Sequence, residues 1–317
     1  MFTLAQLESA LAIVRAHVPP TPQREWPLLS QRLGASLIVK HENHAPTGAF
    51  KVRGGLVYME RLKRERPQVA GVISATTGNH GQSIAFAARA FGVRAVIYVP
   101  HGNSPEKNAA MRSLGAELVE HGKDFDTARM RAKEVAVEQK LEFINSFGPD
   151  LVVGVASASY ELLGAMRDLD VVFVPIGMGS CICGMITVRD LLGLKTEIVG
   201  VQAAGAPSYY QSWRQNRIVN TDTVNTKADG LATRMPDAQS VEIIRRGGSK
   251  IVLVDDAAIA DAIRIYYTDT HNLVEGAGAA PLAAALAEKD RLRGKRVAVM
   301  ATGGNIDLSL FRTWVAP

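Results

Sequence analysis

The segment HENHAPTGAFKVRGG, residues 41–55, holds the residue around which the chain is organised, Lys51. It follows the apolar run Leu37-Ile38-Val39, which is typical of the end of a buried strand, and residues 45–48 then break the strand with turn residues. A helix is expected next, which places Lys51 in the first turn after a strand end, where its amine could face a cleft. A lone lysine in such a position is usually a surface cation. A buried one instead suits a Schiff base with an aldehyde cofactor, because burial lowers the pKa of its amine.

The composition is that of an ordinary globular protein. The 317 residues could form one large or two medium domains, and a hydrophobic content of 47% is enough for a substantial core. The formal net charge is +5, but 36 basic residues are interspersed with 31 acidic ones. The densest basic cluster, residues 60–67, lacks the interleaved aromatic residues of a nucleic-acid surface. We therefore expect no nucleic-acid partner.

The first 18 residues carry Glu8 within their apolar periodicity and show no basic leader, so they predict an amphipathic helix rather than a targeting segment. No apolar run is long enough to cross a membrane, and no membrane partner is expected. Cys181 and Cys183 are one residue apart in a glycine loop, which argues against a disulfide framework and against a metal site. The expected location is the cytoplasm.

Predicted strands and helices alternate along the chain. The predicted strands cover residues 36–40, 71–74, 95–99, 117–119, 143–144, 171–175, 197–202, 251–254 and 296–301. The predicted helices cover residues 28–33, 54–66, 82–91, 105–114, 124–140, 157–169, 184–192, 256–270 and a stretch after Gly278, whereas residues 209–233 are expected to form long loops. This alternation predicts parallel sheets with helices on both faces.

Three further segments lie where a predicted strand ends: TTGNHGQ at 76–82, PIGMGSCICG at 175–184 and ATGGNID at 301–307. The loop at 177–181 follows the apolar strand VVFVP and offers backbone N–H groups and a helix N-terminus to an anion. Glycines in such a loop also serve tight turns. Likewise, Thr76 or Thr77 could simply cap a helix.

These three segments, together with K-x-E…TGAFKxRG around Lys51, resemble the pyridoxal-phosphate enzymes of the tryptophan-synthase-β type (fold type II), and among them the serine/threonine dehydratases and serine racemases. The likeness extends from about Pro20 to the C-terminus. It implies an α/β fold with two doubly wound parallel-sheet lobes and pyridoxal 5'-phosphate in the cleft between them. It also implies a large domain of residues 1–63 and 146–317, with a small domain of residues 64–145 inserted in it.

The resemblance implies a role for each candidate cofactor residue. Lys51 would bind the cofactor as a Schiff base, Phe50 would lie against it, and Asn79 would bind its phenolic oxygen. The phosphate would bind the loop of Gly177, Met178, Gly179, Ser180 and Cys181. Relatives usually have four successive glycines followed by a leucine or methionine here, and Met178, Ser180 and Cys181 occupy three of those five places. Thr302 would meet the pyridine nitrogen and Glu275 would lie near the ring. Alternatively, Thr302 caps a turn and Glu275 merely begins a helix.

The substrate would be held by Thr76, Thr77, Asn79, His80 and Thr233, by the same resemblance. Arg234 would either pair with a second carboxylate or be a surface charge. Racemising relatives have a serine at the position of Thr77, so threonine here makes a racemase less expected. The matching positions of a divalent-cation site in relatives hold Gln202 and Ser208, and because hard cations prefer charged oxygens, no metal site is expected.

The implied activity is dehydration of a β-hydroxy amino acid such as L-threonine or L-serine to a 2-oxo acid and ammonia, with Lys51 as catalytic base. A hydroxyl at the pyridine nitrogen favours prompt loss of the β-substituent over a long-lived carbanion. The alternatives are a dehydratase for a bulkier substrate (phenylserine, 3-hydroxyaspartate or a hydroxyectoine-derived compound), an amino-acid racemase, and a non-enzymatic cofactor-binding protein. Relatives are mostly homodimers or homotetramers, so one of these states is expected.

Overall fold

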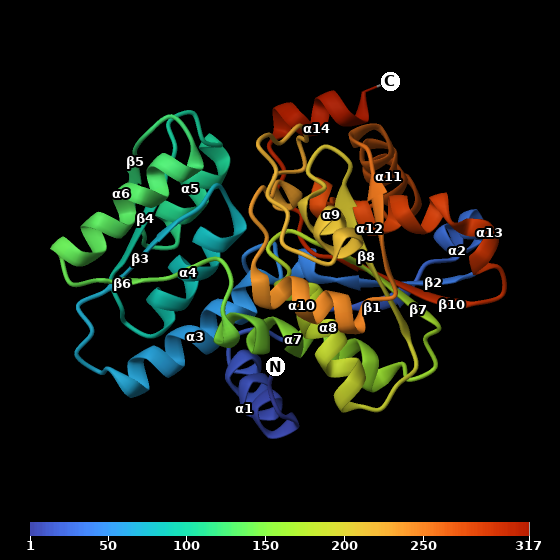
Figure 1. The fold of residues 1–317 in the computed structure, drawn as a ribbon, viewed down its shortest axis with the longest axis horizontal. Coiled ribbons are helices and arrows are strands. Elements are labelled where there is room, and N and C mark those ends of the chain that lie inside the picture. The colour runs from blue at the N-terminus through green and yellow to red at the C-terminus, as the bar shows by residue number, and fades with distance from the viewer. Residues whose placement is uncertain (317) are drawn as a thin grey trace.

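The computed structural model describes residues 1–316 and contains two β-sheets that lie side by side (Figure 1). The larger sheet has the strand order β1-β2-β10-β7-β8-β9, in which only β1 is antiparallel to its neighbour. Its strands are β1 (Gln23–Glu25), β2 (Ser36–His41), β10 (Arg296–Ala301), β7 (Val171–Pro175), β8 (Glu197–Ala203) and β9 (Lys250–Val254). The smaller, all-parallel sheet is β5 (Glu117–Glu120), β4 (Ala95–Val99), β3 (Val72–Ala75) and β6 (Glu142–Phe143).

The four inner strands of the larger sheet, β2, β10, β7 and β8, are buried on both faces, as their continuous apolar runs predict. Val172 and Val174 pack into one core together with residues of α1 (Leu4–Arg15), α7 (Pro149–Ala165) and α8 (Ser180–Leu191). Val171 and Phe173 pack on the opposite face with α2 (Pro27–Leu33), α11 (Asp256–Thr270), α12 (Gly276–Ala287) and α14 (Leu308–Val315). The two-residue alternation of a strand thus divides one apolar run between two cores. We call this sheet and its helices the large lobe.

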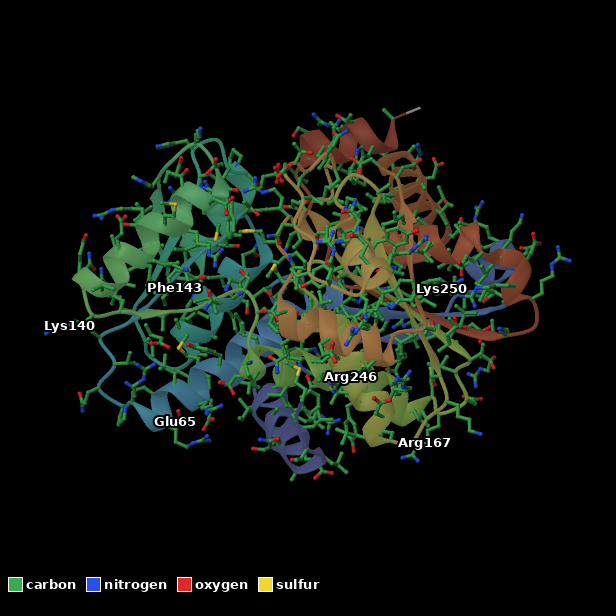
Figure 2. The ribbon with its side chains drawn as sticks, viewed as in Figure 1. Glu65, Lys140, Phe143, Arg167, Arg246 and Lys250 are labelled. Atoms are coloured by element: carbon green, nitrogen blue, oxygen red, sulfur yellow. The ribbon has the colours of Figure 1, made fainter. Side chains whose placement is uncertain are left out.

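The small lobe consists of the four-stranded sheet with α4 (Asn79–Ala90), α5 (Pro105–Ser113) and α6 (Phe125–Glu138). Ile73 and Val96 pack against α6, whereas Val72 and Ile97 face the core that contains Ile84 of α4. Charged side chains such as Lys140 and Arg167 project from the outside of the molecule (Figure 2). Among residues 1–316, no helix is both long and apolar enough to cross a membrane.

Helix α3 (Lys51–Glu65) connects the lobes, because it packs against both α4 and α7. Two adjacent glycines allow this close approach. A Cβ at Gly54 would lie 2.6 Å from the carbonyl oxygen of Leu151 in α7, and one at Gly55 would collide with Ser83 of α4. The helix begins at Lys51, three residues before the predicted start at Gly54. Glycines are unfavourable inside a helix, and the close packing of Gly54 and Gly55 on both sides offsets that cost.

Several helices differ from the prediction. α7 and α8 begin at Pro149 and Ser180 rather than at 157 and 184, and residues 209–233, expected to be loops, include α9 (Ser208–Gln215) and a short 3₁₀ turn at Asp229–Leu231. The sequence SYYQSWRQ of α9 has few strong helix formers, and burial of Tyr209 and Ser212 supports the helix. Strand β1 and helices α10 (Ala238–Gly247), α13 (Lys289–Leu292) and α14 were not predicted.

Candidate active site

A cavity of about 1240 Å³ lies between the two lobes, outside the carboxyl ends of the parallel strands. This is where open α/β sheets usually bind ligands. Its walls come from the segments that follow β3, β7 and β10, from residues 229–237 and from the start of α12. The cavity lining includes Phe50, Lys51, Thr76, Thr77, Asn79, His80, Gly177, Met178, Gly179, Ser180, Cys181, Thr233, Arg234, Glu275 and Thr302. The structure therefore brings all of the sequence-predicted site residues together.

Lys51 lies in the first turn of α3, and its amine enters the cavity. Nζ donates a hydrogen bond to Ser180 Oγ at 3.2 Å and lies 5.2 Å from the ring centroid of Phe50. The carbonyl of Lys51 accepts a 2.6 Å hydrogen bond from Ser83 Oγ, which ties the start of α3 to α4. Burial lowers the pKa of Lys51 to about 8, and the nearby Cys181 acts weakly in the opposite direction. The surface-cation interpretation is therefore wrong.

Behind Lys51, a buried ion-pair network fixes α3 to β2 and α7. Arg53 bonds Glu42 at 2.8 Å and Glu161 at 2.9 Å, and Lys40 bonds Glu161 at 2.6 Å. The side chains of Lys40, Glu42 and Arg53 are fully buried, and that of Glu161 is 5% exposed. Two cations balance two anions, so the position of the segment that carries Lys51 is strongly determined.

The loop at 177–181 is held from behind by large-lobe helices. A Cβ at Gly177 would collide with the carbonyl oxygen of Gly230, and one at Gly179 would collide with Ser240. Gly179 also has φ +92°, a left-handed conformation that favours glycine. α8 begins at Ser180, so the first N–H groups of this helix lack intrahelical partners and are available to an anion beside Lys51.

Cys181 and Cys183 are free and buried, in agreement with the prediction of no disulfide. Burial raises the pKa of each thiol to about 12, so both stay neutral and poorly nucleophilic near neutral pH. Within residues 1–316, no group of three or more His, Cys, Asp or Glu side chains is arranged to bind a metal ion. The two thiols serve as small packing residues.

Asn79, the first residue of α4, connects three segments of the site. Its Nδ2 donates to Glu275 Oε1 at 2.7 Å, and its Oδ1 accepts from Asn305 Nδ2 at 2.8 Å. The N-cap of α4 is Gly78, so the capping interpretation of Thr76 and Thr77 is wrong. Thr76 Oγ1 instead accepts from the backbone N–H of Gly78 at 3.1 Å, within the turn before the helix. Asn305 was overlooked as a site residue, although it lies in the ATGGNID motif.

His80 is buried beside this turn. Burial, together with the positive charge of Lys51, lowers the pKa of His80 to about 3, against a weaker backbone interaction with Ile144. The imidazole is therefore neutral at physiological pH. Its Nε2 is buried and has no hydrogen-bond partner among the described residues.

Glu275 precedes α12 at the N-cap position, but its side chain caps no backbone N–H. Oε1 accepts from Asn79, whereas Oε2 is buried and has no partner in the described part of the chain. Burial, and then the negative charge of Asp229, raise the pKa of this carboxyl. Glu275 thus begins the helix, as one alternative predicted, while its side chain faces the cavity, as the other predicted.

Thr302 follows β10, and its carbonyl accepts a 3.0 Å hydrogen bond from the backbone N–H of Phe50. The next helix, α14, begins only at Leu308, so Thr302 does not cap it. Thr302 is buried and lines the cavity.

Two ion pairs that sequence reasoning missed cross the mouth of the cavity. Lys107 of α5 pairs with Asp229, and Arg234 pairs with Asp126 of α6. Arg234 is therefore engaged between the lobes rather than being an isolated surface charge. The sequence gives no signal for these pairs, because their members lie more than a hundred residues apart.

Comparison with known proteins decides the family. The model for the family described as "Pyridoxal-phosphate dependent enzyme" matches residues 14–303. The chain belongs to this family. It is an enzyme that uses pyridoxal phosphate, and both the resemblance and the cofactor prediction are confirmed.

This pyridoxal-phosphate enzyme is 39% identical over 281 residues to the L-threonine ammonia-lyase of Geobacter sulfurreducens, covering 88% of this chain and 69% of that relative. Among solved structures, the processed form of threonine deaminase isoform 2 from Solanum lycopersicum is 30% identical with a TM-score of 0.91, covering 99% of this chain and 93% of that one. Maize serine racemase is 26% identical with a TM-score of 0.92, covering 98% and 96%. The predicted α/β fold with two parallel-sheet lobes is confirmed.

The cavity also fits the cofactor on its own evidence. A buried amine with a lowered pKa suits an aldehyde, and free N–H groups at the start of α8 suit a phosphate. Glu275 and His80 both line this cavity, and each has a buried polar atom, Oε2 and Nε2, without a partner among the described residues.

Proposed function

We propose that this enzyme is an ammonia-lyase that converts a β-hydroxy amino acid such as L-threonine or L-serine to a 2-oxo acid and ammonia. The observation that carries the proposal is the buried amine of Lys51, with its lowered pKa, beside the N-terminus of α8. The similarity to an L-threonine ammonia-lyase and a threonine deaminase supports the substrate class. Pyridoxal phosphate, when bound, supplies an aldehyde for an amine and a ring that acidifies the α-proton of an amino acid.

The chain would hold this cofactor through residues of both lobes. Lys51 would bind the aldehyde, with Phe50 beside it. The phosphate would accept hydrogen bonds from the backbone of residues 177–181, which line the cavity at the start of α8. Asn79, Glu275 and Thr302 would contact the ring atoms. Asn79 is well suited to an oriented contact, because Glu275 and Asn305 fix both ends of its amide.

Lys51 would also act as general base. With a pKa of about 8, roughly a tenth of its amine is neutral at pH 7, and this neutral form can accept the α-proton of the substrate. Ser180 Oγ, 3.2 Å from Nζ, orients the amine. The same amine would be the group that holds the aldehyde of the cofactor between turnovers.

The substrate carboxylate would lie at the turn formed by Thr76, Thr77, Asn79 and His80. This turn precedes α4, whose first N–H groups favour an anion. His80 is neutral and would act as a hydrogen-bond donor or acceptor without adding charge. Thr233, from the opposite wall, would contact the side chain of the substrate.

A panel of threo and erythro β-hydroxy amino acids tests this proposal, with release of ammonia and of 2-oxo acid measured separately. We expect equal amounts of the two products from L-threonine or L-serine. No turnover of any panel member by cofactor-loaded enzyme would contradict the proposal. Preference for phenylserine or 3-hydroxyaspartate would keep the reaction and change the substrate.

Amino-acid racemisation is the second candidate, favoured by the structural similarity to maize serine racemase. A hydroxyl at Thr77, in the cavity wall, supports it, while the added methyl group opposes it. Chiral analysis of unreacted serine separates the candidates. Accumulation of D-serine faster than 2-oxo acid would establish the racemase.

For the organisation of the chain, we propose domain boundaries at residues 63/64 and 145/146, so that the small domain of 64–145 is inserted in the large one. The change from one sheet to the other within these limits supports the boundaries. We further propose a cytoplasmic homodimer or homotetramer. Two free, buried thiols are compatible with a reducing compartment.

A further inference from the structure

In the loop at 177–181, Met178 places a side chain between two glycines that admit none. Gly177 is blocked by the carbonyl of Gly230, and Gly179 is blocked by Ser240. Met178 is therefore the residue of this Gly-Met-Gly segment that can reach the cavity. Its backbone is fixed, because Tyr209 Oη donates a 2.9 Å hydrogen bond to the carbonyl of Met178. Tyr209 is itself buried and accepts from the backbone N–H of Asp237 at 3.1 Å.

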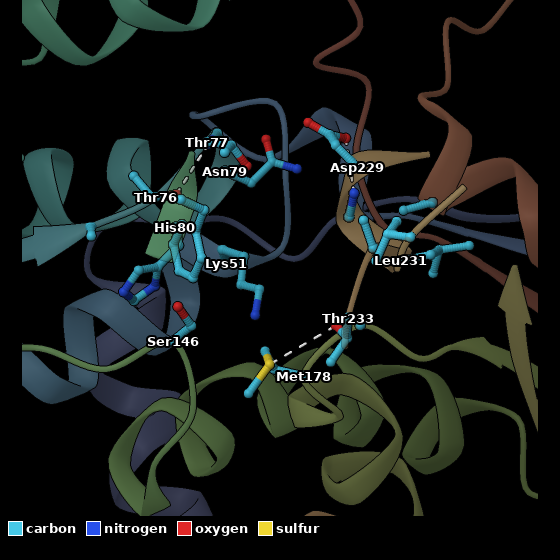
Figure 3. Close-up of a pocket in the computed structure, with 18 of the residues that line it drawn as sticks. Lys51, Thr76, Thr77, Asn79, His80, Ser146, Met178, Asp229, Leu231 and Thr233 are labelled. Atoms are coloured by element: carbon cyan, nitrogen blue, oxygen red, sulfur yellow. Dashed lines mark hydrogen bonds between the residues drawn. The ribbon is translucent and has the colours of Figure 1, made fainter. Parts of the chain in front are cut away.

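The thioether of Met178 meets Thr233 across the cavity. Met178 Sδ lies 4.0 Å from Thr233 Oγ1, and Figure 3 shows this contact beside the amine of Lys51. Thr233 is held in place from behind, since its carbonyl accepts a 2.7 Å hydrogen bond from Ser208 Oγ at the start of α9. Both side chains line the cavity, and Thr233 is 8% exposed.

We propose that Met178 and Thr233 together form the wall that limits the size of the substrate's β-substituent. This inference rests on the proposed function, because it assumes that an amino acid binds beside Lys51. The thioether of Met178 offers apolar contact and neither side chain carries a charge, so the pair favours a small apolar group such as the methyl of threonine. A phenyl group or a second carboxylate would have to displace them. Because methionine has three rotatable side-chain bonds and can move, the wall should weaken the binding of larger substrates without preventing it.

Binding of unreactive amino acids tests the wall without requiring turnover. L-2-aminobutyrate and L-phenylalanine have no β-hydroxyl group, and they differ in the group on the β-carbon. Their dissociation constants are measured from the change in visible absorption of the bound cofactor. The dissociation constant of L-phenylalanine divided by that of L-2-aminobutyrate is the ratio that reports the size limit. It stays measurable even if the enzyme proves not to be an ammonia-lyase.

Met178→Ala should lower this ratio, in favour of phenylalanine, by about tenfold or more, since one methylene in an apolar pocket changes discrimination by about 10- to 200-fold. Met178→Leu, which conserves volume, should keep the parent ratio. Met130→Ala is the matched control, because Met130 is 65% exposed on α6 and does not line the cavity. An unchanged ratio in Met178→Ala, with the cofactor still bound, would overturn the proposal.

If Met178→Ala failed to bind the cofactor, its dissociation constants could not be measured. A variant with a smaller truncation is therefore tested beside it. Met178→Val should shift the ratio in the same direction by severalfold, and Met178→Phe should shift it in the opposite direction. Equal ratios in the valine, leucine and phenylalanine variants would also overturn the proposal. If the enzyme released no ammonia from any substrate but the Met178 variants still shifted the ratio, the proposed reaction would be rejected. The proposal that Met178 and Thr233 limit substrate size would stand.

Discussion

Asn79 Nδ2 donates to Glu275 Oε1 at 2.7 Å, and this hydrogen bond joins the first residue of α4 in the small lobe to the residue that precedes α12 in the large lobe. It orients the Asn79 amide toward the cavity and engages one oxygen of a buried carboxyl group. The other oxygen of Glu275 has no partner among residues 1–316. The carboxyl thus positions Asn79, while its own charge is poorly compensated.

Glu275→Gln tests whether the ionised carboxylate of Glu275 destabilises the folded protein. Burial and the charge of Asp229 raise the pKa of Glu275 in the folded state. The folded state therefore binds this proton more tightly than the unfolded state, and its contribution to stability is lost as pH rises through the raised pKa. The variant should match the parent at acidic pH and exceed its free energy of unfolding by about 1–2 kcal/mol at alkaline pH. Urea unfolding of the cofactor-free proteins measures the difference, and a parent that is more stable at alkaline pH would contradict it.

Cofactor loading should depend on pH through Lys51. Only a neutral amine attacks an aldehyde, and burial lowers the pKa of Lys51 to about 8. The loading rate of cofactor-free enzyme should therefore rise about tenfold per pH unit below pH 8 and level off above it, as expected from the neutral fraction. Stopped-flow absorbance measures this rate. A rate that still rises steeply near pH 10 would indicate an ordinary exposed lysine.

Lys51→Ala should abolish turnover and covalent attachment of the cofactor. Borohydride reduction of the loaded parent enzyme, followed by peptide mapping, should place the pyridoxyl label on Lys51. Lys63 is a suitable control because it lies on the same helix and bonds the carbonyl oxygen of Pro67, away from the cavity. Lys63→Ala should keep both label and turnover. A label on a different lysine would remove Lys51 from its proposed role.

Local sequence patterns predicted most strands, and the resemblance to a known family assigned the candidate site residues near their ends. The turn at 76–80, the loop at 177–181 and Thr302 follow the apolar strands β3, β7 and β10 directly, whereas Lys51 comes ten residues after β2 ends at His41. Because β3 belongs to the small sheet and the other strands to the large one, the predicted alternation of strands and helices did not by itself show that these segments meet.

Tertiary contacts determine what the sequence did not predict. α9 forms from weak helix formers because Tyr209 is buried behind the 177–181 loop. The pairs Lys107–Asp229 and Arg234–Asp126 depend on how the two lobes meet. The start of α3 at Lys51, before the predicted start at Gly54, goes with the contacts that Gly54 and Gly55 allow with α7 and α4. No local pattern contains these contacts.

Gly179→Ala should weaken cofactor binding strongly. Gly179 has φ +92°, and a Cβ there would collide with Ser240, so the loop must shift before its N–H groups can bind a phosphate. Gly193→Ala is the matched control, since Gly193 has φ +64° with nothing within 4 Å of an added Cβ. The control should lose only about 1–2 kcal/mol of stability from the left-handed conformation, with unchanged cofactor affinity. Equal cofactor dissociation constants for the two variants would contradict the predicted role of the loop.

The buried network behind Lys51 should make Glu161 critical for stability. Glu161→Gln leaves Lys40 and Arg53 with one anion, Glu42, and an uncompensated buried charge, so unfolding should become easier by about 3–5 kcal/mol. Although burial opposes it, the hydrogen bonds and charges of Arg53 and Lys40 lower the pKa of Glu161. The parent's advantage is therefore present at neutral pH and is lost as pH falls through that lowered pKa.

Glu60→Gln provides the comparison for this prediction. Glu60 pairs with Arg64 on the exposed side of α3, the helix that carries Lys51 and Arg53. That pair should contribute less than about 1 kcal/mol. Urea unfolding of both variants and the parent, each without cofactor, separates the network from general charge effects, since no ligand then stabilises the folded state. If Glu161→Gln is no more destabilising than Glu60→Gln, the network does not fix the segment that carries Lys51, and packing of Gly54 and Gly55 against α7 and α4 would remain as what holds it.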